Sequence, residues 1–481
     1  MNLLLASTTY KEINWLSIGI NLSIFVLILI TSIILLWKLK FDSKGYKLLF
    51  AFYTIFWFPL MLVRSYRGTM HNDLENNSDL LWVPLTVYGL VGIFVRPLFD
   101  FFGVYFKSRK LIVYFSLLLQ IATFIPLIVQ PNFTTNVIQS IGVGIGASCI
   151  GTFSLWFNEQ HAKTRPFLTI SILSLPPLLA DFLASPIQSI IRSLSPYSSS
   201  NPGIIPNHAN PEFMRYLWVI ALCAIAINLV VGFFLKENQT CVGLKNNVSH
   251  KKVISSKWDW LILIGVIVVG ASIDFTKFAT GDSIATLTIQ DIGGASNTAP
   301  FEGYVSSLFS GFQLIGGILM GLFLSKYFSK SLIYIFGGLF FVFYNVSTIL
   351  ITNEYQSPSL TGAIIFLATQ PLNGFGFGIL YNLLIANVLS LTFKTRKFSP
   401  LGLYQSFASL TISCGTFFTS AIKSFIKNIN YAEATLIISL TLIGITILMG
   451  IVYYFVNYIE VGFKHKPLWT FDKTGHKLPI H

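Results

Sequence analysis

The sequence predicts an all-α protein that crosses a membrane many times. Of its 481 residues, 53% are hydrophobic and only 11% are charged, and the mean hydropathy is +0.69. One or two soluble cores could not bury this much apolar surface. Apolar runs of about 20 residues, the length that spans a bilayer, recur along the chain, and basic residues gather in alternate loops between them.

Thirteen apolar runs are expected to form membrane-spanning helices. They cover 16–38, 46–66, 80–105, 111–130, 134–157, 166–191, 215–236, 258–280, 303–325, 331–352, 360–391, 398–424 and 432–457. The first run has no basic segment before it and is followed by Lys38 and Lys40. We therefore expect a retained helix there rather than a cleaved signal.

The remaining twelve runs divide at a polar, basic segment into two groups of six. Segment 1–45 is then an extra amino-terminal helix with its loop, and 46–236 is a first six-helix bundle. Residues 237–257 form a linker between the bundles, 258–457 a second six-helix bundle, and 458–481 a tail.

The net charge of +13 is explained by its distribution between the loops. If the segment from Lys38 to Lys47 is cytoplasmic, most other loop lysines and arginines fall on the same side, together with the lysines of the tail. Basic cytoplasmic loops are the rule in membrane proteins. We expect a cell-membrane protein with its amino terminus outside and its tail in the cytoplasm, and no nucleic-acid partner. The Ile-, Asn-, Lys- and Phe-rich composition suggests a bacterium.

Motifs of enzymes and metal sites are missing from the apolar runs. None of the seven histidines lies in the middle of a run, and no Cys/His set has metal-ligand spacing. The glycines of Gly374-Phe-Gly376-Phe-Gly378 lie inside an apolar run without a preceding strand, so they favour close helix packing over phosphate binding. We expect no enzyme, no metal and no cofactor. We expect the chain to be a monomer, and we expect its partners to be the lipid bilayer and a small solute.

Two loops at corresponding places in the halves share a pattern. The first reads Arg96-Pro-Leu-Phe-Asp100-Phe-Phe-Gly103 with Arg109 beyond it, and the second runs from Gly321 through Ser325 and Lys326. They resemble the loop signature of the major facilitator superfamily, whose members are secondary transporters with two six-helix bundles. The resemblance implies alternating access and gives Asp100, Gly103, Arg109 and Lys326 a role in gating. Arg96 replaces the signature's glycine and Ser325 its second acidic residue. Alternatively, these basic loops only determine topology.

Charged residues inside the apolar runs are the candidates for solute binding. Arg64 and Lys277 lie near the outer ends of the first and seventh core runs, at matching positions. Two cations facing one central cavity would repel each other unless an anion lay between them. Alternatively, each side chain snorkels to the outer interface. Asp274 lies on the same helical face as Lys277 and could neutralise it. Asp181, in the fifth core run, could carry protons or serve packing.

Leu62-Val63-Arg64, with Tyr66 two residues on, resembles the first-helix signature of the organophosphate:phosphate antiporters. The resemblance implies that Arg64 and Lys277 bind a phosphate group, although lysine stands where that family has arginine. It predicts transport of a small anionic, phosphorylated solute, such as a sugar phosphate, in exchange for phosphate. One alternative is a proton-coupled carrier or efflux permease of a neutral or cationic solute that uses Asp181 or Asp274. Another is a membrane scaffold or receptor without transport.

Overall fold

The computed structural model describes most of the predicted core. The described ranges are 44–64, 82–161, 166–194, 211–237, 252–280, 298–355, 359–393, 399–425 and 431–461, with residues 239 and 242 and eight positions between Gly19 and Ile34. Most of the extra helix predicted at 16–38 and most of the tail predicted at 458–481 lie outside the described residues.

Twelve long helices form the described part of the chain. They are α2 (Lys44–Arg64), α4 (Trp82–Tyr105), α5 (Arg109–Val129), α6 (Phe133–His161), α7 (Pro166–Leu194), α8 (Pro211–Phe233), α9 (Lys257–Ala279), α11 (Thr298–Leu319), α13 (Lys330–Glu354), α14 (Leu360–Leu389), α15 (Pro400–Phe425) and α16 (Tyr431–Val461). Nine described helices are long and apolar enough to cross a membrane. The prediction of an all-α membrane protein with twelve core helices is confirmed.

The helix predicted at 303–325 is less regular than its sequence suggests. α11 ends at Leu319, and a π-helical turn covers Met320–Leu324 before a last short helix, α12 (Ser325–Tyr327). Such turns insert an extra residue into a helix and change the direction of the side chains that follow. The loop that corresponds to the first-half signature therefore leaves its helix with a different geometry.

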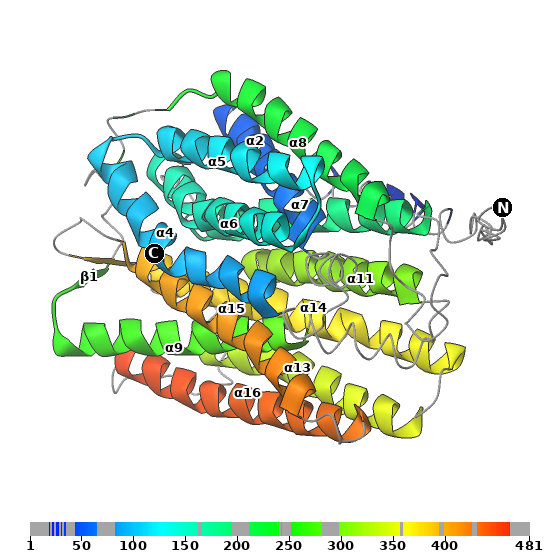
Figure 1. Cartoon of the computed structure of the whole chain (residues 1–481). Helices are drawn as coiled ribbons and strands as arrows, with labels where there is room; N and C mark the ends of the chain where they lie inside the picture. Colours follow the sequence, from blue (N-terminus) through cyan, green and yellow to red (C-terminus); the bar gives the residue numbers. More distant parts are fainter. Residues whose placement is uncertain are drawn as a thin grey trace, which may run out of the picture.

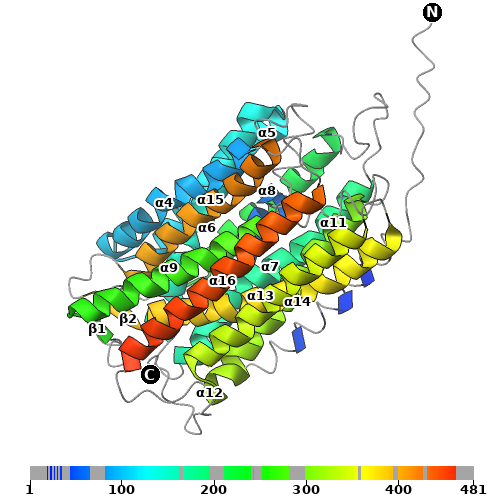
Figure 2. The same cartoon turned by 90° about the horizontal axis from the view of Figure 1, so that it is seen from below.

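Each half of the chain has its own apolar core. The first cluster of buried residues comes almost entirely from α2, α4, α5, α6, α7 and α8, and the second almost entirely from the helices after residue 254. The helices of the first half fill the upper part of Figure 1 and most of those of the second half the lower part. Figure 2 shows helices of both halves running side by side along one direction.

Contacts between the halves follow two helix pairs. On α15, the hydroxyl of Ser413 donates to the carbonyl of Thr86 on α4 at 3.1 Å. The hydroxyls of Ser185 on α7 and Ser307 on α11 share a hydrogen bond of 2.9 Å. These two buried hydrogen bonds connect the two halves of the protein.

A small parallel sheet joins the linker to the second half. β1 (Lys252–Ile254) pairs with β2 (Leu391–Phe393), with Lys252 opposite Leu391. Neither segment was predicted to form a strand. Just after β1, Ser256 and Asp259 form a capping box that fixes the start of α9.

Glycines let α11 and α14 approach closely, as expected for the run from Gly374 to Gly378. A Cβ atom at Gly374 would overlap the carbonyl oxygen of Phe309, and one at Gly378 would overlap that of Gln313. Because backbone atoms cannot move aside as a flexible side chain can, only glycine fits at these positions.

We predict that Gly378→Ala lowers the free energy of unfolding by about 1–3 kcal/mol, because the added methyl group forces α14 away from α11. The matched control is Gly444→Ala on α16, where an added Cβ meets no atom within 4 Å. The thermal unfolding midpoint in detergent measures both variants, and equal midpoints would contradict the predicted overlap.

Candidate functional site

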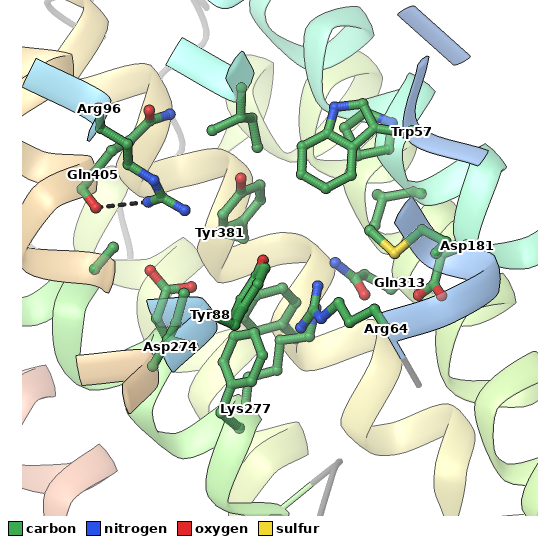
Figure 3. A pocket seen from close by; sticks show the side chains of 18 of the residues that line it. Trp57, Arg64, Tyr88, Arg96, Asp181, Asp274, Lys277, Gln313, Tyr381 and Gln405 are labelled. Carbon is green, nitrogen blue, oxygen red and sulfur yellow. Dashed lines mark hydrogen bonds between the residues drawn. The ribbon is translucent and has the colours of Figure 1, made fainter. Parts of the chain in front are cut away.

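A cavity of about 80 Å³ lies between the two halves. Its lining includes charged and polar side chains from both halves: Trp57, Arg64, Tyr88, Arg96, Asp181, Asp274, Lys277, Gln313, Tyr381, Tyr404 and Gln405. Figure 3 shows most of these side chains around the cavity. Ligand pockets usually measure about 300–1,000 Å³, so this cavity is smaller than a typical ligand site.

Arg64 and Lys277 both line this cavity, where aromatic rings hold their charged groups. The guanidinium carbon of Arg64 lies 4.5 Å from the ring centre of Phe278 on α9. The Nζ atom of Lys277 lies 4.5 Å from the ring centre of Phe377 on α14. Cation–π contacts of this kind stabilise a cation away from water. The structure thus brings the two predicted cations to one cavity.

Both predicted carboxylates line the same cavity. Asp274 is only 5% exposed and interacts electrostatically with Lys277, Arg96 and Arg64. The Oδ2 atom of Asp181 accepts a hydrogen bond of 2.6 Å from the hydroxyl of Ser310 on α11. Asp181 therefore connects the two halves, and Asp274 lies among cations from both.

Arg96 is a cavity residue that the sequence analysis did not assign to the site. It is buried at 9% exposure, and its Nη1 atom donates a hydrogen bond of 2.6 Å to the backbone carbonyl of Gln405 on α15. The dashed line in Figure 3 marks this bond. One signal could have revealed it. Tyr88, Arg96 and Asp100 are spaced by multiples of four on α4, so they share one helical face.

The other polar side chains of the cavity that the sequence did not predict are uncharged, and they come from α2, α4, α11, α14 and α15. They are Trp57, Tyr88, Gln313, Tyr381, Tyr404 and Gln405. Aromatic and amide side chains are common in any helix bundle, so their types alone do not distinguish a cavity wall from a packed core.

A second cluster of charges lies beyond the cavity, at the end of α4. The Nη1 atom of Arg109 lies 3.1 Å from Oδ1 of Asp100, and its Nη2 atom lies 2.9 Å from Oε1 of Glu159. A Cβ at Gly103 would lie 2.6 Å from Nη1 of Arg109, so the glycine makes room for the guanidinium. The structure brings Asp100, Gly103 and Arg109 together as expected and adds Glu159.

Asp100 also reaches the other half of the protein. Its Oδ2 atom accepts a hydrogen bond of 2.7 Å from the backbone N–H of Ser399, at the start of α15. The amino end of a helix carries a partial positive charge, so this carboxylate makes a charge–dipole contact between the halves. The gating role expected of Asp100 stays a prediction.

The matching loop of the second half makes no such contact in the described structure. The hydroxyl of Ser325 donates to the carbonyl of Gly321 in its own helical segment at 3.1 Å. The described ion pair nearby joins Lys330 on α13 to Glu460 on α16 at 2.7 Å, within the second half. The side chain of Lys326 lies outside the described residues, so its expected gating role stays a prediction.

Among the described residues, no group of three or more His, Cys, Asp or Glu side chains could hold a metal ion. The cavity lining combines cations, carboxylates, phenols and amides around a small space.

No protein-family model matches the sequence, and no curated protein matches it. Solved structures do match. A major facilitator superfamily transporter, FucP, in the outward conformation aligns with a TM-score of 0.57 at 14% identity over 86% of this chain and 99% of that chain. The human organic anion transporter MFSD10 (TETRAN) aligns with a TM-score of 0.60 at 12% identity over 85% of this chain and 100% of that chain.

A further match is the fucose:proton symporter FucP of E. coli in its N162A form, with a TM-score of 0.53 at 13% identity over 86% of this chain and 99% of that chain. The chain therefore has the fold of the major facilitator superfamily transporters. Identities of 12–14% show the fold and leave the solute to be argued from the cavity.

We predict that Arg109→Gln destabilises the protein by about 3–5 kcal/mol, because it leaves the buried carboxylate of Asp100 and the partly buried carboxylate of Glu159 without their cation. Lys107→Gln, at an exposed position two residues earlier, is the control and should leave stability unchanged. Thermal unfolding of the purified variants measures the difference, and similar midpoints for both would show that the ion pairs contribute little.

Proposed function

We propose that this protein is a secondary transporter that exchanges a small anionic, phosphorylated solute for phosphate by alternating access. One observation carries the proposal. Arg64 of the first half and Lys277 of the second half line one cavity, together with Arg96. A phosphate group is the kind of ligand that arginine and lysine bind with charge-assisted hydrogen bonds.

The charge of the cavity favours an anion. Its lining holds three cations, Arg64, Arg96 and Lys277, and two carboxylates, Asp181 and Asp274, so it carries a net positive charge when all five are ionised. Charges held away from water are costly unless they are paired. A bound anion would supply the missing negative charge, whereas a bound cation would add to the excess.

Exchange follows from the same balance. The cations belong to different halves, so an anion between Arg64 and Lys277 would offset their repulsion while the halves close on it. An empty cavity would lack that compensation and would reorient poorly between its two open states. Net transport would then depend on a counter-substrate of similar charge, for which phosphate is the simplest choice.

A second function is favoured by the burial of Asp274. A carboxylate that is 5% exposed and lines the solute cavity could take up and release a proton in a transport cycle, and Asp181 offers another such group. One solved structure with this fold is a fucose:proton symporter, while another is an organic anion transporter. A proton-coupled carrier or efflux permease of a neutral or cationic solute is therefore the alternative, and a scaffold without transport is a third.

We predict that phosphate-loaded proteoliposomes exchange internal phosphate for external labelled sugar phosphate without a pH gradient. Arg64→Ala and Lys277→Ala should each lower the exchange rate at least tenfold, because each removes a cation from the anion site. Lys257→Ala, exposed at the start of α9, is the matched control and should exchange normally. Rates of labelled uptake give the result, and normal exchange in either cavity variant would refute the proposed pair.

Asp274→Asn separates the two transport mechanisms. If the carboxylate carries protons, this variant should lose uptake driven by a pH gradient while retaining exchange of one solute molecule for another. If anion exchange operates, wild-type flux should be independent of the pH gradient. Strict dependence of wild-type flux on that gradient would support the proton-coupled carrier, and the absence of flux for every solute tested would support the scaffold.

A further inference from the structure

Arg96 joins the cavity to the contact between the halves. Its guanidinium lines the cavity, while its Nη1 atom holds the carbonyl of Gln405 on α15 at 2.6 Å. Its Nε atom is buried and has no hydrogen-bond partner among the described residues. A guanidinium with one face engaged by a neutral carbonyl and an unused buried donor has capacity left for another acceptor.

The contact made by Arg96 lies beside the contact made by Asp100. The two residues are four apart on α4, which places them on one helical face. Arg96 binds the carbonyl of Gln405, and Asp100 binds the N–H of Ser399. Both partners lie in the first two turns of α15 or directly before it. One face of α4 therefore connects a cavity cation with the charge–dipole contact at the end of the helix.

We propose that Arg96 senses the solute and transmits its binding to the contact between α4 and α15. This inference rests on the proposed function, since it needs an anionic solute. Charge-assisted hydrogen bonds to an oxyanion are roughly twice as strong as bonds between neutral groups. An oxyanion in the cavity draws the guanidinium of Arg96 away from the neutral carbonyl of Gln405 and uses the Nε donor as well. The loss of the hydrogen bond between Arg96 and Gln405 weakens the contact of α4 with α15 next to Asp100, and that end of the protein opens.

The geometry also narrows the class of solute. An arginine binds planar or tetrahedral oxyanions through two parallel N–H donors, and the partnerless Nε of Arg96 can form one of such a pair. Arg64 and Lys277 stand elsewhere on the cavity wall. A solute that engages all three cations carries an oxyanion with at least two negative charges, as phosphate and phosphate monoesters do.

The test measures the separation of α4 and α15 with spin labels at Tyr105→Cys on α4 and Phe407→Cys on α15, in a background without native cysteines. Both positions are exposed. Distances between the two spin labels are recorded by pulsed electron–electron double resonance with and without inorganic phosphate, and with chloride as the control anion. Calorimetry on the same samples measures phosphate binding.

If the hydrogen bond between Arg96 and Gln405 holds α4 against α15, Arg96→Gln should shift the measured distances to longer values without any anion, because that contact is lost. Lys257→Gln removes an exposed cation at the start of α9, outside the cavity lining, and should leave the distances of the anion-free protein unchanged. In the wild-type protein, phosphate should produce the longer distances, and chloride should not. Arg96→Lys keeps the positive charge but loses the paired N–H donors of the guanidinium. Phosphate should therefore change the distances less in this variant than in the wild type, while the variant remains folded.

Two results would overturn the inference. Unchanged distances in Arg96→Gln would show that the bond to Gln405 does not hold the helices together. Phosphate that binds the wild-type protein in the calorimeter without changing the distances would show that Arg96 does not transmit binding. Absence of phosphate binding altogether would instead refute the proposed anion site, and the sensing role with it.

Discussion

The need to hold charges inside a membrane-spanning fold governs this structure. A charged side chain at the centre of a transmembrane helix costs about 2.5–3.5 kcal/mol in insertion measurements, so it must be paired, solvated or covered by polarisable groups. Arg64 lies against the ring of Phe278, and Lys277 lies against that of Phe377. Asp181 accepts a hydrogen bond from Ser310. Each of these contacts joins two helices, and those of Arg64 and Asp181 join the two halves. The contacts that stabilise the charges therefore also hold the walls of the cavity together.

The helix pair α4 and α15 links this cavity to one end of the protein. Arg96 and Asp100 use successive turns of α4 to hold a carbonyl and an N–H of the same partner helix. In the equivalent loop of the second half, the hydroxyl of Ser325 forms a hydrogen bond within its own helical segment. This segment follows a π-helical turn. Among the described residues, the charge–dipole contact with the other half is therefore made by the first-half loop and not by its second-half counterpart.

Much of the fold could be predicted from the sequence because hydrocarbon thickness sets the length of each helix. The predicted span 360–391, for example, corresponds to α14 at Leu360–Leu389. The convergence of Arg64 and Lys277 followed from their matching depth in the two halves. The strands β1 and β2 could not be foreseen, because each is three residues long and its partner is far away in the sequence. Arg96 was missed because its role depends on a backbone carbonyl of α15, which the residue types do not reveal.

The central claim is that the cations of both halves bind one anionic group, and a ligand-bound structure tests it most directly. A cryo-electron microscopy map of the protein with saturating phosphate monoester should show density in the cavity within hydrogen-bond distance of both Arg64 and Lys277. Density that instead contacts Asp274 or Asp181 and leaves the two cations on their aromatic rings would contradict the claim and favour the proton-coupled carrier.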